Sequence, residues 1–198
     1  IRMKSIKTII LLLSLFVGLS AQSITIDYQT GWNMVGLPAE VEDPYYLSLF
    51  PDAIENTLFS FDITYNPASM LVPGDGYWLM FQEAGTATIV GTPINELTIN
   101  LDAGWNFISG IAETVSIYSV IDPDSIIIPG TLYGFDITYN PESMLVPGKG
   151  YWLRAYQDGE ITFEEISFGA PYYIEPEYDP NSTTATGGGF YQTQCAAI

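Results

Sequence analysis

Two aromatic pairs at equivalent places in the chain are the residues best suited to binding a ligand. Tyr77-Trp78 and Tyr151-Trp152 each follow a Pro-Gly-x-Gly segment. Pro-Gly is typical of a type II turn, because proline presets φ at one position and glycine accepts a positive φ at the next. Each pair then starts a strand and would send one ring to each face. We therefore expect either an aromatic platform for sugar rings or one core ring and one packed ring per pair.

A second repeated segment could hold a divalent cation. Asp62 and Asn66, with their copies Asp136 and Asn140, offer carboxylate and amide oxygens. Oxygen ligands suit Ca²⁺. The same residues beside Thr and Pro also favour an Asx turn, and the sequence has no spaced D-x-[DN]-x-[DN]-G loop. The sequence is compatible with Ca²⁺ at these residues and indicates no other cofactor.

The chain offers little for catalysis, and we expect no enzyme and no catalytic residue. It contains no histidine, which removes Ser-His-Asp chemistry, the usual zinc sites and the commonest general base. A glycosidase that uses a pair of carboxylates is the remaining enzymatic alternative, because the chain has 23 acidic residues. No pair among them is singled out by its sequence context.

These candidate residues belong to a tandem duplication. A nineteen-residue block at 61–79 recurs 74 positions later at 135–153. The two copies differ at two positions, and at one of them Asp75 of the first copy corresponds to Lys149 of the second. The segment Gly-Trp-Asn at 31–33 recurs at 104–106, 73 positions later. A period of this length fits a small folded module better than a solenoid repeat of 20–50 residues.

The fold predicted for each copy is all-β. Short runs that alternate apolar and polar residues, or that are rich in β-branched and aromatic residues, are bounded by turn residues. Residues 44–50 and 115–121 could each add one or two helical turns. We expect two β-rich repeats of about 73 residues, 22–95 and 96–168, packed with pseudo-two-fold symmetry. The aromatic residues expected in or against the cores are Trp32, Phe61, Tyr77, Trp105, Phe135 and Tyr151.

Both ends of the sequence have a different composition. Residues 1–21 combine basic residues, a short apolar run and small residues, which is typical of a secretory signal peptide. The apolar run is too short to span a membrane, so we expect a secreted or cell-surface protein without a membrane span after cleavage. Residues 169–198, rich in Pro, Tyr, Ser, Thr and Gly, are predicted to be a linker and the start of a truncated domain.

The charge of the chain excludes one class of partner. Three of its five basic residues lie within the first 21 positions, whereas all 23 acidic residues follow them. Such a surface repels phosphate backbones, so we expect no nucleic-acid binding. The partners that remain are a glycan or a surface protein, and the oligomeric state is not indicated.

The paired G-W-N and P-G-x-G-Y-W segments, over roughly residues 23–168, resemble tandem repeats of secreted and surface proteins from Bacteroidetes-like marine bacteria, which often precede a type IX secretion sorting domain. The resemblance implies extracellular display and a non-catalytic β-rich accessory module. We accordingly predict a structural or adhesion module that presents or spaces a neighbouring domain. The alternative is a carbohydrate-binding module that uses Tyr77, Trp78, Tyr151 and Trp152.

Overall fold

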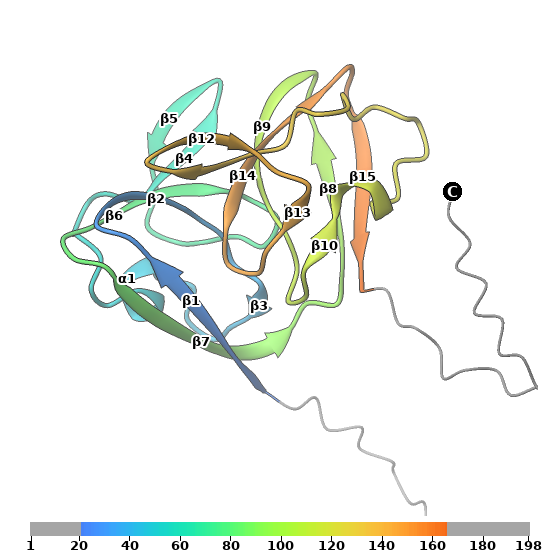
Figure 1. Ribbon diagram of the computed structural model, residues 1–198. Coiled ribbons are helices and arrows are strands. Elements are labelled where there is room, and N and C mark those ends of the chain that lie inside the picture. The colour runs from blue at the N-terminus through green and yellow to red at the C-terminus, as the bar shows by residue number, and fades with distance from the viewer. Residues whose placement is uncertain (1–20, 166–198) are drawn as a thin grey trace, which may run out of the picture. The chain divides into compact units, whose positions relative to one another are not determined.

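Antiparallel β-strands make up most of the structure, a computed structural model that describes residues 21–165 (Figure 1). Every strand pairing is antiparallel. The all-β prediction is therefore confirmed. No helix within residues 21–165 is long and apolar enough to cross a membrane. The predicted signal peptide, apart from Ala21, and the predicted linker lie outside the described residues.

The first repeat holds a three-stranded and a four-stranded sheet. The three-stranded sheet has the order β1-β7-β3, with β1 at Gln22–Tyr28, β7 at Gly85–Pro93 and β3 at Ala39–Glu40. The four-stranded sheet has the order β2-β6-β4-β5, with β2 at Gly31–Val35, β6 at Tyr77–Phe81, β4 at Phe59–Asp62 and β5 at Thr64–Pro67. One helical turn, α1 (Tyr46–Leu49), lies between β3 and β4, where a turn was predicted.

The second repeat has counterparts of the four-stranded sheet and of the β1-β7 pair, but its other strands differ from those of the first repeat. Its four-stranded sheet has the order β9-β14-β11-β12, with β9 at Gly104–Ser109, β14 at Gly150–Ala155, β11 at Tyr133–Asp136 and β12 at Thr138–Pro141. β8 (Glu96–Leu101) pairs with β15 (Gly159–Glu164), and β10 (Val115–Ser116) pairs with β13 (Met144–Leu145). A 3₁₀ turn, η1 (Ile117–Ser119), stands within the second predicted helical segment.

Alternation along the strands gives each four-stranded sheet one core face. In β6, Tyr77, Leu79 and Phe81 are buried, whereas Trp78 and Met80 between them are only partly buried. Successive side chains of a strand point to opposite faces, so the three buried residues enter the core of the first repeat. β14 contributes Tyr151, Leu153 and Ala155 to the core of the second repeat in the same way.

A third apolar cluster joins the two repeats. It is formed by Met34, Phe61 and Trp78 from the first repeat and by Phe107, Tyr133, Phe135 and Trp152 from the second. All seven residues come from the four-stranded sheets. The faces of these sheets that point away from the two cores are therefore the faces through which the repeats meet.

Backbone hydrogen bonds connect the repeats reciprocally through the Pro-Gly-x-Gly turns. The amide of Gly36 donates to the carbonyl of Gly148 at 3.0 Å, and the amide of Ser109 donates to the carbonyl of Gly74 at 2.8 Å. Gly74 and Gly148 have φ of +91° and +76°, and a Cβ on either would lie within 2.6 Å of an isoleucine side chain of the other repeat. Each turn motif therefore makes the contact between the repeats, which explains why both copies retain glycine there.

Candidate functional site

The sheet faces between the repeats carry a dense set of aromatic rings. Residues that pair directly across antiparallel strands share a face. In the first repeat, Met34, Trp78 and Phe59 form one such row. Phe107, Trp152 and Tyr133 form the corresponding row of the second repeat. The next positions along the strands add further rings to the same faces: Trp32, Phe61 and Tyr65, and their counterparts Trp105, Phe135 and Tyr139.

Strands β4 and β5 form a hairpin in the first repeat, and β11 and β12 form its counterpart in the second. Each hairpin contacts the other repeat. Phe61 packs edge-on against Trp152, with ring centroids 4.8 Å apart, and Phe135 packs in the same way against Trp78, also at 4.8 Å. Phe107 stacks almost flat on Trp152 at 4.7 Å. We call this layer of packed rings the floor of the site. The more exposed rings lie on its solvent side.

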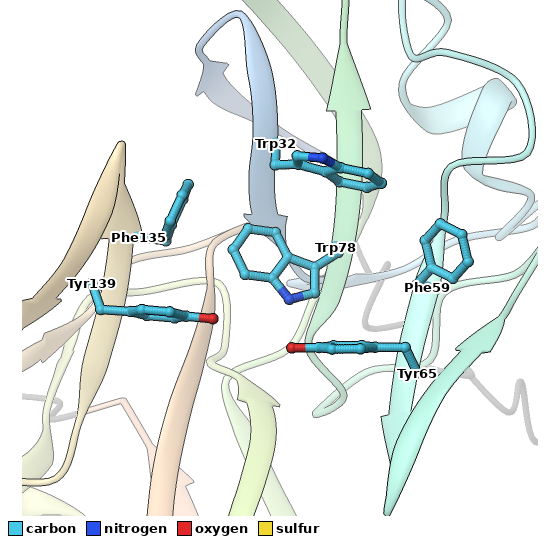
Figure 2. Close-up of a pocket in the computed structure, with 6 residues that line it drawn as sticks. All are labelled: Trp32, Phe59, Tyr65, Trp78, Phe135 and Tyr139. Atoms are coloured by element: carbon cyan, nitrogen blue, oxygen red, sulfur yellow. The ribbon is translucent and has the colours of Figure 1, made fainter.

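The first of two aromatic hollows lies above this floor and has a volume of about 450 Å³. Figure 2 shows its six lining side chains arranged around a common space, with the phenol oxygens of Tyr65 and Tyr139 pointing toward each other. The first hollow is lined by Trp32, Phe59, Tyr65, Trp78, Phe135 and Tyr139. Four of these residues belong to the first repeat and two to the hairpin of the second, so neither repeat forms the hollow alone.

The second hollow has a volume of about 420 Å³ and is lined by Phe61, Trp105, Tyr133, Tyr139 and Trp152. Here the second repeat supplies most of the lining, and the hairpin of the first repeat supplies Phe61. Tyr139 belongs to the walls of both hollows. We call the two hollows together the aromatic groove.

The rings at the rim of the groove are open to solvent. Trp32 is 42% exposed and Tyr65 is 48% exposed, and their counterparts Trp105 and Tyr139 are 45% and 51% exposed. Partial burial raises the pKa of the Tyr139 phenol, the neighbouring Tyr65 raises it further, and a hydrogen bond with Trp152 lowers it. The groove thus combines exposed aromatic faces with few polar atoms.

The four residues predicted to bind a ligand divide into two kinds. Tyr77 and Tyr151 are buried, and their phenol oxygens accept hydrogen bonds from the amides of Val72 and Val146 at 3.0 and 2.9 Å. Burial is the main cause that raises the pKa of each phenol to about 12. Trp78 lines the first hollow, and Trp152 lines the second. The pairs therefore do send one ring to the core and one to the groove.

Trp32 and Trp105 are expected in or against the cores, but they are 42% and 45% exposed and belong to neither core, so this prediction is wrong. They follow a glycine with positive φ at the start of β2 and β9, and their rings lie on the groove side of the sheets. The buried residues beside them are Asn33 and Met34 in β2. A Gly-Trp strand start alone does not specify which face the ring takes.

Sequence reasoning missed the contribution of the hairpins, especially Tyr65 and Tyr139. The signal was present: Phe61 and Tyr65 are paired across β4 and β5 and share one face, while Asp62 and Asn66 lie on the other. That alternation makes each hairpin aromatic on one face and polar on the other. A one-residue turn closes each hairpin at Ile63 or Ile137, with φ of 61° and 64°, a rare conformation for a β-branched residue.

The predicted Ca²⁺ ligands lie on the polar faces of these hairpins. Asp62 and Asp136 are exposed, and the side-chain amides of Asn66 and Asn140 donate to the carbonyls of Thr64 and Thr138 at 2.9 and 3.0 Å. These bonds are the local pairing typical of Asx residues near turns. Within residues 21–165, no three His, Cys, Asp or Glu side chains are grouped as a metal site would require.

No protein-family model, curated protein or solved structure matches the chain.

Proposed function

We propose that the two repeats form a non-catalytic binding module of a secreted or surface-displayed protein, and that its ligand site is the aromatic groove. The observation that carries this proposal is the presence of four rings, each 42–51% exposed, around two hollows of similar composition. Full burial of a large apolar side chain contributes about 1.5–3 kcal/mol, and each of these half-exposed rings forgoes part of that contribution. Contiguous exposed apolar patches on soluble proteins mark binding sites.

Carbohydrate is the ligand class that we propose for the groove. The apolar C–H face of a sugar ring can cover an exposed indole or phenol ring, while its hydroxyl groups remain in water at the rim. Trp32 and Trp105 offer such a ring in each hollow. The excess of acidic residues in the chain disfavours an anionic polysaccharide, so the ligand would be a neutral glycan.

A titration of the full chain with soluble neutral glucans, mannans and xylans tests this proposal. Binding is measured by calorimetry and by tryptophan fluorescence. We expect Trp32→Ala and Trp105→Ala each to weaken binding by about tenfold, the size typical of an aromatic contact at the centre of an interface. Tyr118→Ala is the matched control, because Tyr118 is 80% exposed and does not line the groove. Equal losses in the control and the tryptophan variants would contradict the proposal.

A structural module that spaces or presents a neighbouring domain is the second candidate. The reciprocal bonds of Gly36 and Ser109 to the opposite turns favour it, because they fix the two repeats as one rigid unit. A pure spacer needs no free groove. It predicts that the tryptophan variants leave attachment of the protein to its native surface unchanged, whereas the binding module predicts that attachment is lost.

A further inference from the structure

The rings of the first hollow are oriented as the walls of a box. Trp32 meets Trp78 at 86°, Phe135 meets Trp78 at 81°, and Tyr139 meets Trp78 at 78°. Rings at right angles direct their faces and edges from several sides toward one volume, as Figure 2 shows.

The lining of this hollow offers few hydrogen-bonding groups. Its six side chains are two tryptophans, two phenylalanines and two tyrosines, with no carboxylate, amide or basic group among them. A polar group that faced these rings without a hydrogen-bond partner would cost free energy. The chemical group that fits this hollow therefore presents an apolar surface to the rings.

Charge selects among apolar ligands. The faces of Trp, Tyr and Phe rings carry negative potential and attract cations, most strongly for Trp. The chain as a whole has 23 acidic and five basic residues, and this overall negative charge also favours a cation. We propose that the first hollow is an aromatic cage that binds a quaternary ammonium group, such as the trimethylammonium group of choline. This inference rests on the proposed use of the groove as a binding face, and it names the chemistry that one hollow selects.

The second hollow differs from the first at the residue that pairs with its rim tryptophan, which is Arg154 in place of Met80. The guanidinium of Arg154 lies over the ring of Trp105, 5.9 Å from its centroid. Arg154 pairs with Trp105 across β14 and β9, and Met80 is the residue that pairs with Trp32 in the first repeat. A cation of the protein therefore already lies over Trp105, one of the rings that line the second hollow. The first hollow is the one left for a cation from solution.

One further basic residue lies near the first hollow. Lys149 lines a neighbouring depression together with Trp32 and Phe135. Its ammonium donates to the main-chain carbonyl of Asp27, and the carboxylates of Asp27 and Asp136 act on it favourably. Its charge is thus engaged outside the cage, in contrast to that of Arg154.

The test is a calorimetric titration of the full chain with choline and with 3,3-dimethyl-1-butanol, in which carbon replaces the charged nitrogen. We expect one choline site per chain and an affinity at least tenfold higher than that for the neutral alcohol. Trp32→Ala should abolish choline binding, and Trp105→Ala should leave it. Equal affinity for the two ligands would overturn the inference, as would a loss of choline binding in Trp105→Ala alone.

An exchange between the repeats sharpens the test. Met80→Arg should place a guanidinium over Trp32 and weaken choline binding, and Arg154→Met should raise the number of sites from one to two. Wild-type stoichiometry of two would overturn the selectivity for the first hollow. A parallel titration with neutral oligosaccharides separates the two proposals: glycan binding without choline binding defeats this inference alone, and the absence of both defeats the proposed function as well.

Discussion

The two repeats are most alike where they touch each other, and the exchanges at this contact show what the contact requires. Gly36 and Ser109 occupy equivalent positions and face one another, so that a Cβ on Gly36 would lie 2.1 Å from the Cβ of Ser109. Only one of the two copies can carry a side chain there. A duplicated chain packed against itself thus cannot keep every position identical.

The two Pro-Gly-x-Gly turns also differ between the repeats, in the charge of one residue. Asp75 in the first repeat and Lys149 in the second stand between the glycines of the Pro-Gly-x-Gly motif. Asp75 pairs with Ile108 of the second repeat, and Lys149 pairs with Val35 of the first. Opposite charges at these partly exposed positions avoid two charges of the same sign near the contact between the repeats.

The largest effect that we expect comes from making the two central residues alike. Gly36→Ser places a side chain against Ser109 and the turn of residues 147–150, where the backbone of Gly36 is held by its bond to Gly148. Overpacking without room to relax should lower the free energy of unfolding by about 3 kcal/mol or more. Chemical denaturation with urea measures the loss.

The exchanged pair is the control for that variant. Gly36→Ser combined with Ser109→Gly moves the one permitted side chain to the other repeat and should recover most of the stability. A double variant as unstable as Gly36→Ser would show that the cost comes from the conformation of residue 36 and not from its contact with Ser109.

A second prediction concerns the two equivalent core tyrosines at high pH. The pKa of Tyr77 and of Tyr151 is raised from 10.0 to about 12. A phenol with a raised pKa stabilises the fold below pH 10, and this contribution is lost as the pH rises from 10 to 12. Each pKa unit corresponds to about 1.4 kcal/mol, so each tyrosine should contribute roughly 2–3 kcal/mol of destabilisation by pH 12.

Single substitutions separate the two tyrosines. Tyr151→Phe should remove about half of the alkaline loss and should cost about 1–2 kcal/mol at neutral pH, because the amide of Val146 loses its acceptor. Tyr77→Phe should behave in the same way through Val72. Urea unfolding at several pH values between 8 and 12 checks both, and an unchanged alkaline slope would contradict the assignment.

The sequence predicts the strands of this fold well because their signal is local. Alternation of apolar and polar residues and the glycine turns determine where β1, β2, β6 and their copies begin and end. The duplication further predicts that both copies adopt the same elements. Each Tyr-Trp pair is also predicted to send one ring to each face of its strand, as Tyr77 and Trp78 do.

The groove could not be predicted from the same signals, because it depends on which surfaces meet. Phe135 and Tyr139 line the first hollow although most of its wall belongs to the other repeat, more than 50 positions away. Nothing local to Trp32 distinguishes a core ring from a ring at an interface between repeats. The outcome is set by tertiary contacts such as the packing of Phe135 against Trp78.

A third prediction concerns Ser109, the side chain at the contact between Gly36 and Ser109. Ser109 is 1% exposed, and its hydroxyl has no hydrogen-bond partner within residues 21–165. A buried polar group without a partner costs about 1–3 kcal/mol. Ser109→Ala keeps the Cβ and removes this cost, so it should raise the free energy of unfolding by about 1 kcal/mol. A loss of stability would indicate that the hydroxyl has a partner, such as a water molecule.

The smallest effects should come from the charge exchange, and they should have opposite signs. Burial raises the pKa of Asp75, so the charged form is disfavoured in the folded state and stability falls as the pH rises above 3.8. Burial lowers the pKa of Lys149, so stability rises as the pH approaches 10.5. Both side chains are partly open to solvent, which limits each effect to less than about 1 kcal/mol.

Asp75→Asn should therefore flatten the fall in stability above pH 3.8, and Lys149→Met should flatten the rise below pH 10.5. Urea unfolding at pH 4, 7 and 9 measures both profiles while the tyrosines remain protonated. Lys149 also donates to the carbonyl of Asp27, so its replacement carries a pH-independent cost that shifts the whole curve without changing its slope. If the pH dependence of the free energy of unfolding changed with the same sign in both variants, the two turns would not respond separately to their own charges. The difference between Asp75 and Lys149 would then not have an electrostatic origin.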